Sequence, residues 1–296
     1  MRKPRAETRA VVLGLGIIML GHSPAFAGEK DEGRRYNQVQ WKAAHNSYAQ
    51  KTDVLTQLRD WKIRSIEFDL HVNKGKLILR GKAPAGDFLV FHGPGDDFSN
   101  CHLLSDCFEA VAAFHREEPN HDVITIFFDM QGVGEDGHTK ADLYALMRKK
   151  FGDAIFAPGG LLSACPGAQN LQEAVTRSGC GWPLLDDLRG KIILVVSDGR
   201  EEIGKDYDLR QDLLFLVAKG NNPQSLHTDP NLVFFNMAGP KPFLVQVKKA
   251  GFVSRSYWLN EKSAYLQAKS LGANHLATDR IDPKLYPWAN LEEPGP

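Results

Sequence analysis

Short apolar runs alternate with amphipathic stretches along this chain from residue 36 to residue 279. Residues 123–128 (VITIFF) are apolar at nearly every position, which is typical of parallel strands that are covered on both faces. Between such runs, residues like Leu104, Phe108 and Val111 recur at helical spacing and predict helices with one buried face. This alternation favours an α/β fold built on a mainly parallel sheet.

The pattern predicts eight strands and five longer helices. The predicted strands are residues 39–45, 63–71, 88–92, 123–130, 191–198, 232–237, 251–259 and 275–279, and the predicted helices are residues 53–61, 103–118, 139–151, 209–218 and 261–271. Eight strands with helices between them, in roughly 260 residues, match the size of one (β/α)8 TIM barrel. The alternative, a doubly wound sheet, requires a glycine-rich phosphate loop after the first strand, and the sequence has none. We therefore expect one TIM-barrel domain over residues 28–296.

The first 27 residues have the features of a secretory signal peptide. Four basic residues lie near the start, an apolar run follows at residues 11–20, and the segment ends in Ala25-Phe26-Ala27. These are the three parts of such a peptide in their usual order. The apolar run is too short for a permanent membrane anchor. We expect cleavage after Ala27 and export to the periplasm or the exterior.

The charge balance and the cysteines narrow the classes of function. The chain holds 36 basic and 36 acidic side chains, and the part after residue 27 is slightly acidic, with 32 against 35. This balance gives no electrostatic basis for binding nucleic acid. The cysteines contain no C-x-x-C pair, so neither a zinc knuckle nor a redox site is indicated. Of the three possible pairings we favour the local disulfides Cys101–Cys107 and Cys165–Cys180, with buried free thiols as the alternative.

Polar side chains stand at the ends of several predicted strands. They are His45 and Asn46 after the first strand, Glu67, Asp69 and His71 in the second, His92 at the third, Asp129 at the fourth and Asp198 at the fifth. In a (β/α)8 barrel the C-terminal ends of the strands share one rim, and the chemistry of such barrels takes place there. The sequence therefore predicts one polar site on this rim.

The carboxylates in this set indicate a cation. Side chains alternate along a strand, so Glu67, Asp69 and His71 point to the same side. Two neighbouring carboxylates repel each other unless a cation or a proton lies between them. Together with Asn46 and Asp129 they form an oxygen-rich set that suits a hard cation, Ca²⁺ or Mg²⁺. The alternative is that the acids pair with arginine or lysine side chains.

The histidines indicate acid–base chemistry. His45 and His92 each end an apolar run and are followed by polar or turn-forming residues. Two histidines that face each other across a rim can act as general base and general acid, because the unperturbed pKa of imidazole lies near neutral pH. We expect His71 to support the site rather than to carry out catalysis. The sequence lacks the G-x-S-x-G, H-E-x-x-H and P-loop motifs of other hydrolytic schemes.

Several segments resemble the X-region of phosphoinositide-specific phospholipase C, and more closely its secreted calcium-dependent bacterial members. The segments are residues 44–48 (AHNSY), 66–71 (IEFDLH) and 91–94 (FHGP), with further likeness through residues 101–108, Asp129, 188–195 and 272–279. The resemblance covers nearly the whole chain after the expected signal peptide. It implies a TIM barrel whose substrate is a phospholipid or another inositol phosphodiester. We expect a monomer that contacts the membrane surface transiently.

The resemblance also implies roles for individual residues. His45 would stabilise the phosphoryl transition state, and His92 would protonate the leaving diacylglycerol oxygen. One Ca²⁺ would be bound by Asn46, Glu67, Asp69 and Asp129. The inositol 2-hydroxyl would attack phosphorus, which gives a cyclic inositol phosphate that water can open. Contacts with the headgroup would come from Arg255, Tyr257, Trp258, Asp198 and His71, and also from Asp279 and Arg280 at the eighth strand.

Two departures from the family pattern bear on the substrate and the metal. Eukaryotic members carry lysines after the fifth strand that hold ring phosphates, whereas residues 195–198 here are VVSD, which favours an unphosphorylated or a different headgroup. Metal-independent bacterial relatives place an arginine where the cation sits, and the acids in this sequence argue against that branch.

Two alternative functions stay open. Barrel phosphodiesterases of the glycerophosphodiester or sphingomyelinase D kind share a His…E-x-D…His layout, although they usually have an arginine where this chain has Asn46. A barrel that binds headgroups without catalysis is the other alternative. The presence of both His45 and His92 argues against such a binder.

Overall fold

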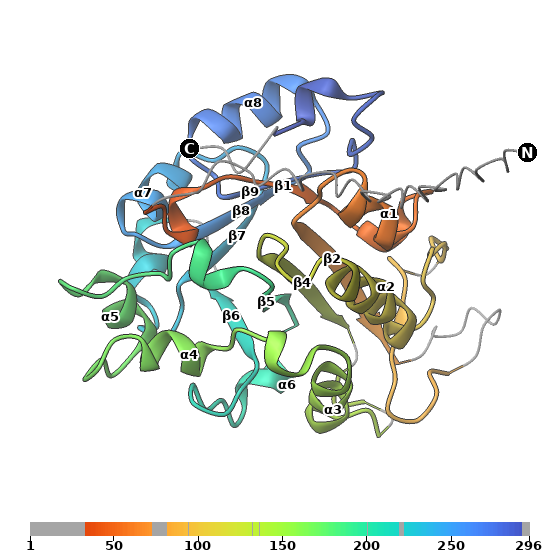
Figure 1. Ribbon diagram of the computed structural model, residues 1–296, viewed down its shortest axis with the longest axis horizontal. Coiled ribbons are helices and arrows are strands. Elements are labelled where there is room, and N and C mark those ends of the chain that lie inside the picture. Colours follow the sequence, from red (N-terminus) through yellow and green to blue (C-terminus); the bar gives the residue numbers. More distant parts are fainter. Residues whose placement is uncertain are drawn as a thin grey trace, which may run out of the picture. The chain divides into compact units, whose positions relative to one another are not determined.

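Eight parallel strands form a closed barrel in the computed structural model of this chain (Figure 1). Their order is β1-β2-β4-β5-β6-β7-β8-β9, and β1 pairs with both β2 and β9, which closes the sheet. The strands are β1 (Trp41–Ala44), β2 (Ser65–His71), β4 (Ile124–Gln131), β5 (Ile192–Asp198), β6 (Leu214–Ala218), β7 (Phe234–Ala238), β8 (Val253–Tyr257) and β9 (His275–Thr278). The predicted TIM barrel is confirmed.

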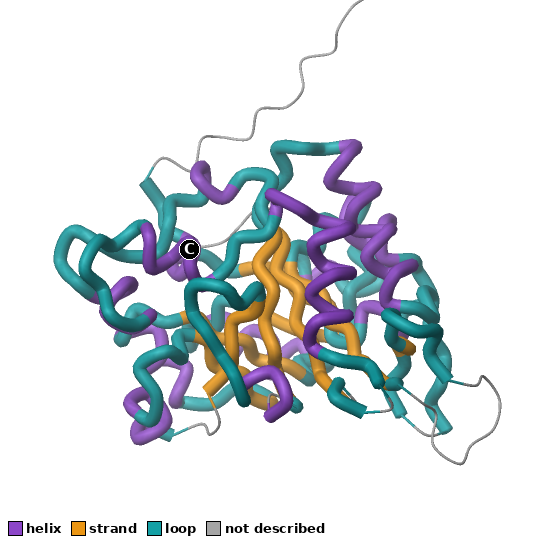
Figure 2. The backbone as a smooth tube through the Cα atoms, turned by 90° about the horizontal axis from the view of Figure 1, so that it is seen from below, coloured by secondary structure: helices purple, strands orange, loops and turns teal. Residues whose placement is uncertain are grey.

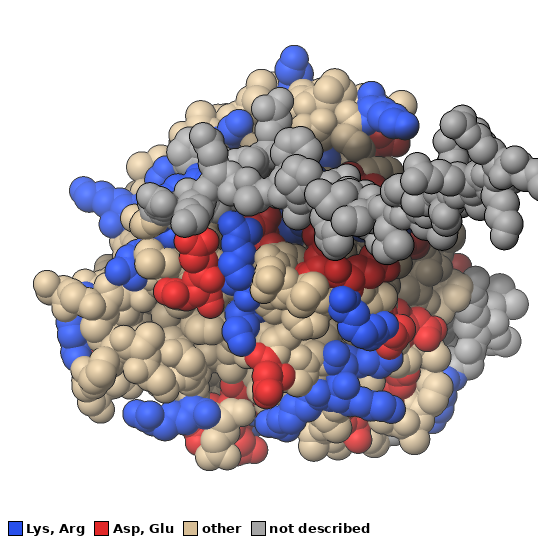
Figure 3. Space-filling model, viewed as in Figure 1, with Lys and Arg blue, Asp and Glu red and all other residues tan. Residues whose placement is uncertain are grey.

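The structure describes residues 33–72, 82–93, 95–131, 133–135, 137–199, 201–218 and 222–291. The expected signal peptide, residues 1–27, lies outside these residues. The described residues all belong to one compact unit. Basic and acidic side chains are intermixed over the face of the molecule in Figure 3, in keeping with their equal numbers in the sequence. Within the described ranges, no helix is both long and apolar enough to cross a membrane.

Helices cover the outside of the strands (Figure 2). They are α1 (Val54–Arg59), α2 (Leu104–Glu117), α3 (Lys140–Phe151), α4 (Pro158–Ser163), α5 (Leu171–Thr176), α6 (Glu201–Gly204), α7 (Phe243–Lys249) and α8 (Lys262–Ser270). The predicted helices at α1, α2, α3 and α8 are confirmed. In α2 the expected face, with Leu104, Phe108 and Val111, is buried. The four helices α4 to α7 were not predicted, because each has only four to seven residues.

One predicted helix is a strand. Residues 209–218 were predicted as a helix, but residues 214–218 (LFLVA) form β6, which lies between β5 and β7. All five side chains of β6 are buried. A run that is apolar at every position suits a strand covered on both faces, whereas a surface helix would show polar residues at helical spacing.

One predicted barrel strand lies outside the barrel. Residues 88–92 were expected to form the third parallel strand, but only β3 (Leu89–Val90) forms there, and it pairs antiparallel with the end of β2. Val90 lies opposite Leu70, and Leu89 lies opposite His71. A parallel return requires a crossover connection, usually a helix, and the described residues between β2 and β3 contain none. The expected total of eight barrel strands is correct only because β6 replaces β3.

Two disulfides join the four cysteines in the local pairing that the sequence favoured. Cys101 is bonded to Cys107 at the start of α2, and Cys165 is bonded to Cys180 across α5. Each bond closes a short loop, so both constrain the surface of the barrel rather than supplying chemistry.

Candidate active site at the barrel rim

A cavity of about 480 Å³ opens at the C-terminal ends of the barrel strands. Its lining consists of His45, Asn46, Glu67, Asp69, His92, Asp129, Ser197, Asp198, Val217, Ala218, Asn236, Arg255, Tyr257 and Trp258. The fold thus brings together the residues that the sequence proposed as catalytic, metal-binding and headgroup-binding, with the exception of His71, Asp279 and Arg280. They come from β2, β4, β5 and β8, from the loops after β1 and β8, and from the loop after β3.

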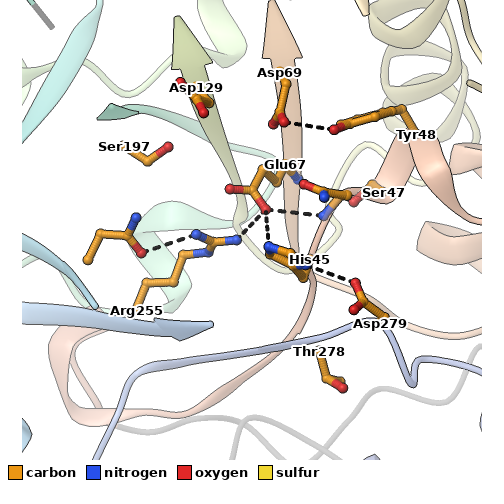
Figure 4. Close-up of polar contacts among 12 residues, drawn as sticks. His45, Ser47, Tyr48, Glu67, Asp69, Asp129, Ser197, Arg255, Thr278 and Asp279 are labelled. Atoms are coloured by element: carbon orange, nitrogen blue, oxygen red, sulfur yellow. Dashed lines mark hydrogen bonds and ion pairs between the residues drawn. The ribbon is translucent and has the colours of Figure 1, made fainter. Parts of the chain in front are cut away.

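His45 lies directly after β1 and is held from two sides. Its backbone N–H donates to Thr278 O at 3.0 Å, and its ring Nδ1 lies 2.8 Å from Asp279 Oδ1. An ionised carboxylate can only accept, so Nδ1 carries the proton in this contact. The ring's Nε2 faces Glu67 Oε2 at 4.0 Å, as the close-up in Figure 4 shows. Nε2 is therefore the nitrogen of His45 that can exchange a proton with a bound molecule.

Asp279 follows β9 and orients this imidazole. Burial alone would raise the pKa of Asp279, but the hydrogen bond and the charge of His45 lower it below its usual value. The other carboxylate oxygen accepts from Asn260 Nδ2 at 2.5 Å, and Asn260 Oδ1 accepts from the backbone of Asp279 at 2.8 Å. A carboxylate that fixes the tautomer of a histidine is the arrangement of catalytic triads. The sequence indicated Asp279 only as a headgroup contact.

His92 reaches the cavity from a loop and not from a barrel strand. It follows β3, its side chain is exposed, and its Nδ1 lies 3.1 Å from Asp96 Oδ2. The sequence placed His92 at a strand end, and the structure corrects that position while keeping the residue in the cavity lining. An exposed imidazole beside a carboxylate can take up and release a proton at the cavity mouth.

Three aspartates stand level with one another on the adjacent strands β2, β4 and β5. Asp69 is the register partner of Asp129, and Asp129 is the partner of Asp198 because a β-bulge shifts the register after Phe128. Ser197 is the extra residue of the bulge, and its Oγ donates to Phe128 O at 2.9 Å. Figure 4 shows Asp69 and Asp129 side by side at the ends of their strands.

A glycine is required next to this bulge. Gly199 has a φ of +66°, and a Cβ at this position would lie 1.9 Å from Met130 O. Only glycine avoids this clash, and only glycine adopts the left-handed backbone without strain. The chain therefore turns sharply after Asp198, whose Oδ1 accepts from the Gly199 N–H at 2.8 Å.

The crowded carboxylates perturb one another. Burial, and after it the neighbouring Glu67 carboxylate, raises the pKa of Asp69. Tyr48 donates its hydroxyl to Asp69 Oδ2 at 2.8 Å, while the buried Asp69 Oδ1 has no hydrogen-bond partner. Burial also raises the pKa of Asp129, and the charges of Asp198 and Glu67 act in the same direction. The rim therefore holds more negative charge than its own protein partners balance.

This donor set fits a hard cation by its chemistry. It offers carboxylate and amide oxygens, and one buried oxygen, Asp69 Oδ1, lacks a partner. In the part of the chain that the structure describes, however, no three acidic, histidine or cysteine side chains converge closely enough to hold a metal. The orientation of Glu67 partly explains why the donor set does not converge, because its carboxylate points toward an arginine.

Arg255 lies inside the barrel and pairs with Glu67. Its Nη2 is 2.5 Å from Glu67 Oε2, and its Nη1 donates to Asn236 Oδ1 at 3.1 Å. The sequence offered arginine pairing as the alternative to metal binding, and for Glu67 this pairing is present. Asn236 on β7 was missed, although a single polar residue inside an apolar run could have signalled it.

The remaining predicted contacts divide between the rim and the core. The ring of Tyr257 is parallel to that of His45, with centroids 5.8 Å apart, and Trp258 stands 60% exposed at the cavity edge with a φ of +60°. A bulky residue with such a backbone conformation is an outlier of the kind that concentrates at functional sites. His71 instead packs on Phe91, and its Nε2 contacts Phe91 O at 2.9 Å. The structure does not bring His71 into the cavity lining.

Comparison with known proteins finds similar folds among solved structures. No family model and no curated protein sequence matches the chain. Among solved structures, a calcium-dependent phosphoinositol-specific phospholipase C from a Gram-negative Pseudomonas species superposes with a TM-score of 0.72 at 22% identity, covering 88% of this chain and 96% of that one. The same enzyme in its myo-inositol complex gives a TM-score of 0.71 at 21% identity, over 83% and 91% of the two chains.

A second enzyme gives a similar result. The Ca²⁺-dependent phosphatidylinositol-specific phospholipase C of Streptomyces antibioticus has a TM-score of 0.66 at 20% identity, covering 86% of this chain and 98% of that one. The chain has the fold of these bacterial phospholipases C. It covers nearly the whole length of both, 96% and 98% of those chains.

Proposed function

We propose that this protein is a phosphodiesterase that cleaves phosphatidylinositol, or a related inositol phosphodiester, between phosphorus and the diacylglycerol oxygen. One observation carries the proposal: His45 is oriented by Asp279 at 2.8 Å, and its Nε2 faces a cavity that also contains His92. An oriented imidazole and a second imidazole in one cavity supply the base and the acid that this reaction needs. The likeness to phospholipase C structures supports the choice of a phosphodiester.

The side chains divide the proton transfers between them. His45 Nε2 accepts the proton of the inositol 2-hydroxyl as that oxygen forms its bond to phosphorus. Asp279 keeps Nδ1 protonated and stabilises the imidazolium that results. His92 donates a proton to the diacylglycerol oxygen as its bond to phosphorus breaks. The products are diacylglycerol and a cyclic inositol phosphate, which water can open with the two histidines in exchanged roles.

We propose that the reaction uses one Ca²⁺. The residues that would hold it are Asn46, Glu67, Asp69 and Asp129. The unpartnered Oδ1 of Asp69 and the raised pKa values of Asp69 and Asp129 support a cation here. When bound, the ion would neutralise charge on the phosphate and favour ionisation of the attacking hydroxyl.

The cavity favours a headgroup without ring phosphates. Among its described lining residues, Arg255 is the only lysine or arginine, and Asp198 adds a further negative charge. Carboxylates accept hydrogen bonds from ring hydroxyls and repel phosphomonoesters. Tyr257 offers a ring face beside His45, and the exposed Trp258 suits transient contact with a membrane surface. The two disulfides fit a protein exported to an oxidising compartment.

Phosphorus NMR tests the reaction directly. Phosphatidylinositol incubated with the enzyme and Ca²⁺ should give the resonance of a cyclic inositol phosphate, and a chelator should abolish it. Release of phosphatidic acid, or turnover of glycerophosphodiesters in preference to phosphatidylinositol, would favour the sphingomyelinase D or glycerophosphodiester alternative. Absence of turnover on all three substrate classes would favour a binding protein.

The role of His92 can be separated from that of His45 by changing the leaving group. A nitrophenyl phosphodiester of inositol needs no proton on its leaving oxygen. It should largely restore the rate of His92→Ala but not that of His45→Ala. Equal rescue of both variants, or of neither, would mean that the acid and the base are wrongly assigned.

A further inference from the structure

A buried ion pair crosses the interior of the barrel below the rim. Arg255 on β8 reaches Glu67 on β2, with Nη2 at 2.5 Å from Oε2. These strands are not neighbours, because β9 and β1 lie between them in the sheet. The side chain of Arg255 is 1% exposed and that of Glu67 is 8% exposed. Figure 4 shows the guanidinium and the carboxylate meeting in the middle of the site.

The guanidinium forms hydrogen bonds through its two terminal nitrogens but not through Nε. Nη1 donates to Asn236 Oδ1 at 3.1 Å, and the rings of Phe127 and Tyr257 lie 5.0 and 5.3 Å from its central carbon. Its Nε is buried and has no hydrogen-bond partner. A buried donor without a partner is unfavourable, so this position of Arg255 leaves bonding capacity unused.

The same carboxylate oxygen serves several groups of the site. Glu67 Oε2 accepts from the backbone N–H of Asn46 at 3.1 Å and lies 4.0 Å from His45 Nε2, in addition to its contact with Arg255. Glu67 is also one of the residues proposed to hold Ca²⁺. A guanidinium and a divalent cation on one carboxylate, in a buried site, would repel each other strongly.

We propose that Arg255 is an internal counter-ion that competes with the cation for Glu67 and thereby sets the affinity of the site for calcium. This inference rests on the proposed function. A cation that takes Glu67 weakens the hold on Arg255, which already belongs to the cavity lining and carries an unused Nε–H. The released guanidinium is then available to the anionic phosphodiester. Cation and substrate phosphate would therefore strengthen each other's binding, because coupling between two sites is reciprocal.

The experiment measures calcium binding without relying on activity. Calorimetric titration with Ca²⁺, and the shift in Tm that Ca²⁺ produces, are compared for the wild type, Arg255→Gln and Arg255→Lys. Arg116→Gln serves as the matched control, since Arg116 is exposed on α2 and pairs with Glu109. We expect Arg255→Gln to bind Ca²⁺ at least tenfold more tightly than the wild type. Arg255→Lys, which keeps the positive charge, and Arg116→Gln, which lies outside the site, should each bind Ca²⁺ with an affinity within about threefold of the wild type.

The wild-type protein offers a second readout in case Arg255→Gln does not fold. With ¹⁵N-labelled arginine, the buried Nε–H of Arg255 should give a resonance that is absent from Arg255→Lys. Addition of Ca²⁺ should shift it over the same concentration range that raises Tm. Inorganic phosphate should bind more tightly in the presence of Ca²⁺ than in its absence.

The outcomes separate this inference from the proposed function. If Ca²⁺ binds the wild type while Arg255→Gln binds it equally or more weakly, or while the Arg255 resonance stays unchanged, the competition is wrong and the calcium assignment stands. If Ca²⁺ binds none of the proteins, Arg255→Gln included, both are wrong. Binding to Arg255→Gln alone would support the competition in its strongest form.

Discussion

The two ends of the barrel carry opposite kinds of side chain on the same strands. We call the C-terminal ends of the strands the top of the barrel and the N-terminal ends the bottom. Along β4, the side chains of Thr125, Phe127 and Asp129 point to the same side, so this strand carries a hydroxyl and a ring toward the bottom and a carboxylate at the top. At the bottom, the fully buried Tyr36 joins β4 to β9 through its hydroxyl, which lies 2.7 Å from Thr125 Oγ1 and 3.1 Å from His275 Nε2. At the top, the carboxylates face one another around an open cavity.

This difference indicates that the bottom of the barrel mainly contributes stability and that the rim mainly contributes activity. Around Tyr36 the rings of Trp182, Phe234 and His275 lie with centroids 5.3 to 6.4 Å away, so aromatic packing and the hydrogen bonds of the Tyr36 hydroxyl close the bottom. At the top, burial and like charges raise the pKa of Asp69, which means that its ionised form destabilises the folded state. Such unfavourable charges persist in folded proteins where a ligand uses them. Changes at the bottom should therefore alter stability, and changes at the rim should alter activity.

Acidification gives the largest expected effect, and it acts on the bottom. Complete burial lowers the pKa of His275 to about 3, with the Arg255 charge acting in the same direction. An unfolded histidine takes up a proton below about pH 6.5, whereas the folded one does not, so stability is fully present above that pH and is lost as pH falls toward 3. At 1.36 kcal/mol per pKa unit the loss amounts to about 5 kcal/mol.

Urea unfolding at several values of pH between 7 and 3 measures this loss. His275→Gln should show a clearly smaller slope of unfolding free energy against pH. The slope should not vanish, because burial also lowers the pKa of His121, to about 4. Identical slopes for the variant and the wild type would show that His275 does not govern acid stability, and the comparison between the two ends would lose its main support.

A rim histidine should show the reverse behaviour. His45→Ala should lower kcat by about 10²–10⁴-fold, because it removes the proposed base. Its free energy of unfolding should fall by no more than about 1–3 kcal/mol, the cost of leaving the half-buried Asp279 without its hydrogen bond to His45. His227→Ala, an exposed position outside the cavity lining, is the matched control and should leave both quantities unchanged. A large loss of stability in His45→Ala with residual activity intact would contradict the division between the ends.

The sequence could predict those features of the site that depend on a single strand, but not those that depend on contacts between distant segments. The strand ends at His45, Asp69 and Asp129 could be predicted, because alternation along a strand and the shared rim of a barrel follow from the fold class alone. The β6 strand could not, since its five apolar residues have no periodicity that separates a strand from a buried helix. His92 was found through its motif although its predicted strand position was wrong.

The partners of these residues depend on closure of the barrel. The bond from His45 to Asp279 joins positions 234 residues apart, and the Arg255–Glu67 pair joins positions 188 residues apart. A pattern within one strand carries no information on which side chain of a distant strand it will meet. For this reason the sequence offered cation binding and arginine pairing as alternatives for Glu67, and the structure has the pairing.

The two disulfides test the comparison at an intermediate magnitude. Cys180 lies two residues before Trp182 at the barrel bottom, whereas Cys101 adjoins Asn100, whose Nδ2 donates to Ser47 O in the rim loop at 3.1 Å. In the chain-entropy model, removing the Cys165–Cys180 bond by serine substitution of both residues costs about 3 kcal/mol, and removing Cys101–Cys107 costs about 2 kcal/mol.

Only the second change should affect catalysis. Denaturant unfolding and kcat/KM measured on both double variants should show a greater loss of stability without loss of activity for the Cys165–Cys180 bond. The Cys101–Cys107 variant should show a smaller loss of stability together with a lower kcat/KM. Equal loss of kcat/KM in both variants would mean that the two ends are coupled rather than independent.

The smallest expected effect comes from a pair of tyrosines, one at each end. Tyr36 and Tyr48 are both fully buried, and both make a hydrogen bond through the hydroxyl, Tyr36 at the bottom and Tyr48 to Asp69 Oδ2 at 2.8 Å. Substitution by phenylalanine keeps the ring and removes only this bond, which costs roughly 1–3 kcal/mol where a buried partner is left unsatisfied.

Tyr36→Phe leaves Thr125 Oγ1 and His275 Nε2 without that partner, so it should lower the free energy of unfolding and leave kcat/KM unchanged. Tyr48→Phe should lower the free energy of unfolding by a similar amount, and it should also change kcat/KM severalfold, because Asp69 loses the donor that orients it toward the cavity. Since the chemical change is the same in both variants, a difference between their activities can arise only from the end of the barrel at which each hydroxyl lies. Equal effects on kcat/KM would show that the bottom takes part in the chemistry of the rim.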